Sequence, residues 1–138
     1  VVTEYRPGTY IYLDRYQVAK GVGTLEDCAL TVLTTVVSRP TEDRAIIDAG
    51  SKALTSDLLG MTGYGLVLGY PDAVVTGLSE EHGTIDLSAS EKKPEIGERL
   101  RILPNHACPV SNLFDRVHLV AGDHVVATES VAARGRVD

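Results

Sequence analysis

The residue types best suited to chemistry in this sequence are a histidine and a cysteine near its end, His106 and Cys108. In an extended segment, side chains two residues apart point to the same side, so an imidazole nitrogen and a thiolate could converge on one metal ion. Zinc accepts both donors. Pro104 and Pro109 bracket the pair, and each proline restrains its own φ and favours an extended residue before it. The pattern predicts a stiff pair of metal ligands, although catalytic zinc usually takes three protein ligands and structural zinc four.

Four segments, considered together, extend this observation over nearly the whole chain. They are Arg6-Pro7-Gly8-Thr9-Tyr10, Asp48-Ala49-Gly50-Ser51-Lys52-Ala53-Leu54 with Asp57, Glu80-Glu81-His82-Gly83, and Pro104-Asn105-His106-Ala107-Cys108 followed by Asn112-Leu113-Phe114-Asp115. In order and spacing they resemble the C-terminal domain of the D-serine dehydratase and D-threonine aldolase family, pyridoxal-phosphate enzymes of the alanine-racemase-like fold type. In that family the histidine and the residue two positions further on bind a divalent metal beside the cofactor. The resemblance therefore implies that His106 and Cys108 are metal ligands.

The resemblance also bears on the metal and the reaction. Dehydratase-like members carry a cysteine at the second ligand position and use zinc, whereas aldolase-like members tend to carry a carboxylate there. Cys108 thus favours zinc and a dehydratase-like elimination from a β-hydroxy D-amino acid, with aldolase-like cleavage as the alternative. A thiolate also favours zinc over manganese or magnesium on general grounds.

The same family holds pyridoxal phosphate on a lysine of an N-terminal (β/α)8 barrel. A barrel of roughly 250 residues does not fit in 138 residues, so we expect the barrel to be a partner domain and this chain to be one piece of such an enzyme. Residues 1–20 would be the exit segment from the barrel, and residues 21–138 the D-serine dehydratase-like β-domain. The resemblance implies that Gly8 and Thr9 contact the cofactor phosphate, although an ordinary Pro-Gly turn also explains this stretch. A homodimer is expected by resemblance only.

The remaining polar candidates have less specific surroundings. His82 lies in a charged loop, where it could line an active site or simply be solvated. Asp48 follows a short apolar strand and could orient a ligand or cap the next turn. His118 and His124 lie in strand patterns and are expected to be structural. No catalytic residue is assigned from the sequence.

Composition narrows the functional class. The formal net charge is −6, with 43% hydrophobic and 5% aromatic residues, which argues against nucleic-acid binding because phosphate recognition depends on clustered Lys and Arg. No apolar run reaches the roughly 18 residues that span a bilayer, and no signal-peptide pattern is recognisable. We therefore expect a cytoplasmic protein whose two cysteines are reduced.

Hydrophobic patterning predicts an all-β domain, either a β-barrel or a sandwich, with a few short helical turns. Eight or nine short strands are expected, and Pro40 is expected to end the longest of them. The clearest strand patterns cover residues 29–38, 45–48, 73–78, 84–87, 99–103, 116–121 and 124–132. A further apolar run, 66–68, is too brief to assign.

Two other functions are compatible with these residues. One is a non-catalytic β-domain that serves dimerisation or covers an active site. The other is a cysteine-nucleophile hydrolase that uses Cys108 and His106, although a nucleophile and its base more often come from separate elements.

Overall fold

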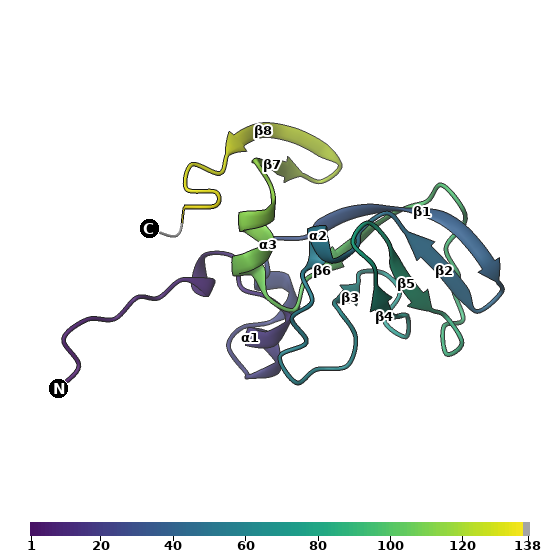
Figure 1. The fold of residues 1–138 in the computed structure, drawn as a ribbon, viewed down its shortest axis with the longest axis horizontal. Helices are drawn as coiled ribbons and strands as arrows, with labels where there is room; N and C mark the ends of the chain where they lie inside the picture. The colour runs from purple at the N-terminus through teal and green to yellow at the C-terminus, as the bar shows by residue number, and fades with distance from the viewer. Residues whose placement is uncertain (137–138) are drawn as a thin grey trace.

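A closed six-stranded barrel is the main body of the molecule in the computed structural model, which describes residues 1–136 (Figure 1). Its strand order is β1-β2-β5-β4-β3-β6, and all neighbours are antiparallel. The strands are β1 (Val32–Thr41), β2 (Arg44–Ile47), β3 (Leu66–Val67), β4 (Val74–Leu78), β5 (Gly83–Asp86) and β6 (Arg99–Leu103). The prediction of an all-β domain is confirmed, and the barrel is the form it takes.

Short helices and a hairpin complete the chain. The helices are α1 (Arg15–Ala19), α2 (Ser51–Leu54) and α3 (Ala107–Leu113), with 3-10 turns at Thr9–Ile11 and Leu25–Asp27. Strands β7 (Arg116–Ala121) and β8 (His124–Ser130) form a separate two-stranded sheet. The longest helix in the described part has seven residues, so none there is long enough to cross a membrane. Residues 137 and 138, at the end of the predicted β-domain 21–138, lie outside the described residues.

The barrel forms because apolar residues alternate with polar or exposed ones along its strands. In β1, Val32, Thr34 and Val36 are buried while Leu33 is exposed, the two-residue period of a strand with one face inward. Equivalent inward positions on the other strands fill the interior with branched aliphatic side chains. Those that are fully or almost fully buried include Val36, Ile47, Val67, Val75, Ile85 and Ile102.

Two details of the strands differ from the prediction. β1 does not end before Pro40 but continues to Thr41, because the pairing with β2 shifts register between Ser38 and Thr41. A proline is tolerated at such a bulge, where its missing N–H breaks no regular ladder bond. The unassigned run 66–68 contains β3, which pairs with both β4 and β6 and thereby closes the barrel.

The predicted extended geometry of the His106–Cys108 segment is wrong. The backbone is extended at His106 (φ −136°, ψ 103°), but Ala107 starts α3, so Cys108 is the second helical residue. Pro109 then lies in the first helical turn, where backbone N–H groups have no intrahelical acceptor, so its missing N–H costs nothing. The two candidate ligands therefore lie on a bend from strand to helix and not on one face of a strand.

Candidate functional site

The candidate ligands lie where β6 leaves the barrel and α3 begins. Figure 1 shows α1, α2 and α3 grouped near one side of the barrel, away from the turn that joins β1 to β2. β6 ends at Leu103, and Pro104 and Asn105 are buried between it and α3. The barrel therefore provides a fixed base from which His106 and Cys108 reach the surface.

His106 is paired with a carboxylate from a distant loop. Its Nδ1 lies 2.8 Å from Oδ2 of Asp57, and about one third of the His106 side chain remains exposed. Asp57 follows α2, so this contact joins the loop between α2 and β3 to the bend between β6 and α3. We call the region around this contact, with His106 and Cys108, the rim. Asp57 belongs to one of the four segments that resemble the family. Nothing in the sequence indicates that it contacts His106.

Asn105, the residue before His106, binds the loop that contains Asp57. It is 1% exposed, and its Nδ2 donates to the carbonyl oxygens of Asp57 (3.0 Å) and Gly63 (2.9 Å). Its Oδ1 accepts a hydrogen bond from the Arg15 guanidinium at 3.1 Å. Each polar atom of this buried amide therefore has a partner. These bonds connect the bend between β6 and α3 to α1 and to the loop of residues 57–63.

Cys108 is exposed, and its Sγ lies 3.2 Å from Oγ1 of Thr9. Cys28 differs in its surroundings, since burial raises the pKa of its thiol and the neighbouring Asp14, Asp27 and Glu26 carboxylates raise it further. A thiolate is the form that binds metal. The raised pKa therefore disfavours Cys28 as a metal ligand.

Asp14 ties the start of α3 to the N-terminal segment. It is 1% exposed, its Oδ1 accepts from the Gln17 backbone N–H at 2.9 Å, and its Oδ2 accepts from the Ala107 N–H at 2.9 Å. One carboxylate thus satisfies the first turns of both α1 and α3. Sequence reasoning missed this residue, although an acidic residue directly before a helical stretch is a recognised N-cap signal.

The predicted phosphate-side residues lie at the same rim. Gly8 precedes the 3-10 turn that begins at Thr9, and a Cβ at Gly8 would meet no atom within 4 Å. Gly8 is exposed and Thr9 is half-buried against Cys108. The structure therefore brings Thr9 and Cys108 together.

The other candidates lie elsewhere. His82 is exposed in the turn between β4 and β5, where its backbone bonds to Ser79. His118 faces Thr128 across the β7–β8 hairpin, with Nδ1 and Oγ1 2.9 Å apart. Asp48 does not cap α2, whose N-cap is Gly50; its Oδ1 instead accepts from the Thr34 hydroxyl and the Thr35 N–H across the strand pair.

No set of three or more His, Cys, Asp or Glu side chains is placed to hold a metal ion within residues 1–136. His106 and Cys108 would consequently need further ligands from water, substrate or another domain. Among the contacts of these residues, His106 is paired with Asp57 and Cys108 with Thr9, rather than with each other. This arrangement does not support the cysteine-nucleophile alternative, which requires a base bonded to the thiol.

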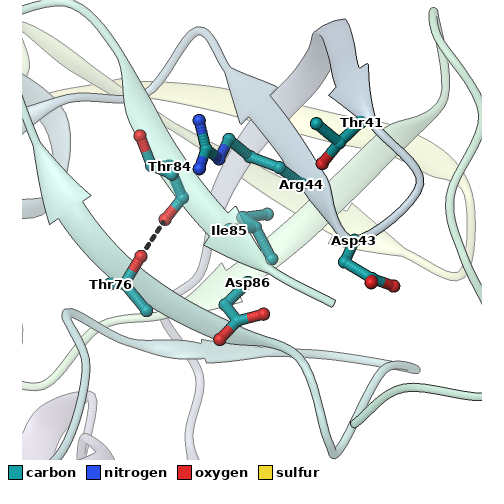
Figure 2. Close-up of a pocket in the computed structure, with 7 residues that line it drawn as sticks. All are labelled: Thr41, Asp43, Arg44, Thr76, Thr84, Ile85 and Asp86. Atoms are coloured by element: carbon teal, nitrogen blue, oxygen red, sulfur yellow. Dashed lines mark hydrogen bonds between the residues drawn. The ribbon is translucent and has the colours of Figure 1, made fainter. Parts of the chain in front are cut away.

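A shallow depression of about 330 Å³ lies at the far end of the barrel (Figure 2). Polar side chains dominate its lining, and Thr76 Oγ1 donates to the Thr84 carbonyl oxygen inside it. The lining residues are Thr41, Asp43, Arg44, Thr76, Thr84, Ile85 and Asp86. None of the predicted site residues is among them, so this depression is separate from the His106–Cys108 rim.

The fold and the rim define a small antiparallel β-barrel domain that presents a histidine and a cysteine beside its N-terminal segment. A family model described as "Putative serine dehydratase domain" matches residues 29–120. The chain belongs to this family, as its motifs predicted.

Individual relatives show two different lengths. An uncharacterized protein of Mycobacterium tuberculosis is 39% identical over 130 residues, which cover 89% of this chain and 96% of the relative. A D-threonine aldolase of an Arthrobacter species is 34% identical over 137 residues, which cover 98% of this chain and 35% of the enzyme. The chain thus spans nearly all of the mycobacterial relative but about a third of the named enzyme.

Solved structures agree with the fold. D-threo-3-hydroxyaspartate dehydratase from Delftia sp. HT23 superposes with a TM-score of 0.77 at 34% identity, over 89% of this chain and 37% of that protein. Structures of a histidine-to-alanine mutant and of a cysteine-to-alanine mutant in the metal-free form, both of a D-threo-3-hydroxyaspartate dehydratase, match equally well. The residues replaced in those two mutants are two positions apart.

Proposed function

We propose that this chain is the metal-bearing β-barrel domain of a pyridoxal-phosphate enzyme that acts on β-hydroxy D-amino acids. The reaction would be a D-serine dehydratase-like elimination, with D-threonine aldolase-like cleavage as the variant. His106 and Cys108 would bind zinc, and Gly8 and Thr9 would face the cofactor phosphate. The names of the relatives support this substrate class, since they include a D-threonine aldolase, a D-serine dehydratase and a D-threo-3-hydroxyaspartate dehydratase.

The contact between Thr9 and Cys108 carries the proposal. The two residues are 99 positions apart in sequence, and each was assigned to a different group, Thr9 to the cofactor phosphate and Cys108 to the metal. In the structure their side chains are 3.2 Å apart. One small region at the rim could therefore serve both groups, as a single active site requires.

The residues present fit a zinc ion. An imidazole on a half-buried side chain and an exposed thiol are donors that zinc accepts. Two protein ligands leave coordination positions for water and substrate, which suits a Lewis-acid role. The spacing of the histidine and cysteine replaced in the solved mutants equals that of His106 and Cys108.

The residues also fit the phosphate of the cofactor. Gly8 leaves open space next to its backbone, which permits the close approach of phosphate oxygens to backbone amides, and the Thr9 hydroxyl lies beside it. When bound, pyridoxal phosphate supplies an electron sink for the substrate Cα and zinc polarises the β-hydroxyl. The part of this chain is to hold the metal ligands on the rigid bend between β6 and α3, close to the phosphate contacts.

Zinc content tests the proposal. We expect about one zinc per chain, lost in His106→Ala and Cys108→Ser but retained in Cys28→Ser, a control that removes the other thiol. A form that includes the barrel domain should convert D-serine or D-threonine, and Cys108→Ser should remove most turnover while leaving the cofactor absorbance. Zinc-free wild-type protein, or zinc retained in both ligand variants, would refute the metal role.

A non-catalytic role in dimerisation or in covering an active site is the second candidate, and one observation favours it. The β7–β8 hairpin exposes large apolar side chains on its two faces: Leu119, Val120, Val125 and Val126. Exposed apolar side chains gathered on one element are typical of an interaction surface, and a homodimer is the assembly we propose for it. This candidate predicts that His106→Ala changes assembly or stability but leaves the zinc content and turnover unchanged.

A further inference from the structure

We infer that Asp57 is a positioning residue that holds His106 in the Nδ1–H tautomer and thereby presents Nε2 as the metal-binding nitrogen. This inference rests on the metal role proposed for His106. It concerns a residue outside the predicted ligand set, and it names the ring atom that binds.

The geometry determines the tautomer. An ionised carboxylate can only accept hydrogen bonds, whereas a neutral imidazole has one donor and one acceptor nitrogen. Since Asp57 Oδ2 lies 2.8 Å from Nδ1, Nδ1 must carry the proton. The opposite tautomer would place the Nδ1 lone pair against the carboxylate oxygen, so the contact leaves the lone pair on Nε2.

Asp57 is held in place independently of its own side chain. Its carbonyl oxygen accepts a hydrogen bond from Asn105 Nδ2 at 3.0 Å, and its N–H donates to Thr55 Oγ1 at 3.2 Å. Asn105 is buried and directly precedes His106 in the chain. The same two consecutive residues, 105 and 106, therefore contact Asp57 through its backbone and its side chain.

The backbone before Asp57 supports a positioning role. Thr55 has a positive φ of 63°, which is an unfavourable conformation for a β-branched residue. The hydrogen bond from the Asp57 N–H to the Thr55 hydroxyl forms in this conformation. Strained residues of this kind persist where the surrounding structure fixes them, often near functional sites.

The expected consequence for metal binding follows from general chemistry. A carboxylate that accepts the second ring N–H of a ligating histidine fixes the ring orientation and increases its basicity, and its loss typically weakens metal affinity 10–100-fold. Within residues 1–136, the Asp57 carboxylate has no other hydrogen-bond partner than His106. Truncation at Asp57 should therefore remove this one contact and leave the loop in place.

Two measurements on the full 138-residue chain test the inference. In the first, long-range ¹H–¹⁵N NMR of the imidazole rings reads the tautomer of His106 without metal, at a pH where the ring is neutral. In the second, competition with a chromophoric chelator gives the zinc dissociation constant. The variants are Asp57→Ala, Asp57→Asn and, as a control for lost charge, Asp72→Ala, since Asp72 is exposed in a separate turn.

We expect the Nδ1–H tautomer in wild-type protein and in Asp72→Ala, and the Nε2–H tautomer, which predominates in unrestrained histidine, in Asp57→Ala. Zinc affinity should fall about 10–100-fold in Asp57→Ala and less in Asp57→Asn, whose carbonyl oxygen can still accept from Nδ1–H. If Asp57 had only a structural role, the ring nitrogen signals of His106 would not change in Asp57→Ala. Zinc affinity would then be no higher in Asp57→Asn than in Asp57→Ala.

A failure of this inference can be distinguished from a failure of the proposed zinc site. An Nε2–H tautomer in wild-type protein, or equal zinc affinity in wild-type and Asp57→Ala, would overturn the inference while the proposed zinc site stands. If wild-type protein binds no zinc at all, the metal role of the proposed function fails and the inference fails with it.

Discussion

The buried carboxylate of Asp14 accepts a hydrogen bond from the backbone N–H of Ala107, at 2.9 Å, across 93 positions of sequence. Ala107 lies between the two candidate ligands and is the first residue of α3. Backbone bonds on either side reinforce this contact, since the N–H groups of Arg15 and Tyr16 donate to the carbonyl oxygens of Pro104 and Asn105. The N-terminal segment and the ligand bend thus form one hydrogen-bonded unit.

The first prediction concerns this unit. Asp14→Ala leaves two backbone N–H groups without their acceptor, one of them buried, and should lower the free energy of unfolding by roughly 2 to 4 kcal/mol. Urea denaturation gives this difference. Asp27→Ala, which removes a capping carboxylate on an exposed turn, should cost less. Equal losses in the two variants would mean that burial of Asp14 contributes nothing.

A second prediction concerns Gly50, before α2. A Cβ built there would lie 2.4 Å from the carbonyl oxygens of Ser79 and Glu80, too close for any real contact. Because the obstruction is backbone, Gly50→Ala should lower the free energy of unfolding by about 2 to 3 kcal/mol. Gly77→Ala is the matched control, since nothing lies within 4 Å of its Cβ position. Thermal unfolding of both variants checks the difference, and similar melting temperatures would contradict it.

The third prediction concerns pH. Burial and the hydrogen bond to Glu98 raise the pKa of Tyr70 to about 12, from an ordinary value of 10.0. A raised pKa in the folded state means that the neutral phenol contributes stability below pH 10, and that this contribution is lost as the pH rises from 10 to about 12.

Tyr70→Phe should therefore be less stable than wild type at neutral pH, by about 1 kcal/mol, and should lose less stability between pH 10 and 12. Denaturant unfolding across this range measures the effect. Tyr5→Phe, at an exposed position, should follow the wild-type curve. Parallel curves for Tyr70→Phe and wild type would show that the phenol is not coupled to folding.

The fourth prediction concerns the β7–β8 hairpin. Its strands pair only with each other in the described residues, and almost all of their side chains are exposed. An isolated two-stranded hairpin is marginally stable in water, so hydrogen exchange should be much faster in β7 and β8 than in β2 and β5 of the barrel. Protection equal to that of the barrel would contradict this and indicate that a second copy or another partner covers the hairpin.

The sequence by itself determined the family, the strand-rich class and the residues of interest. Alternating apolar residues located most strands, and β6 and β7 were predicted with their observed bounds, because a two-residue period is a local property of the chain. Motif order identified His106 and Cys108 as candidates, since a donor type is visible in sequence even when its partner is not.

Only the tertiary structure decided how these parts combine. The two-residue strand β3 closes the barrel through its pairing with β4 and β6, a non-local fact that no short apolar run contains. The first helical turn at Ala107 depends on Asp14, and the pairing of His106 depends on Asp57, 49 positions earlier. The sequence names the donors, but contacts between distant segments determine the orientation of their side chains, because each hydrogen bond needs an acceptor that the fold brings within reach.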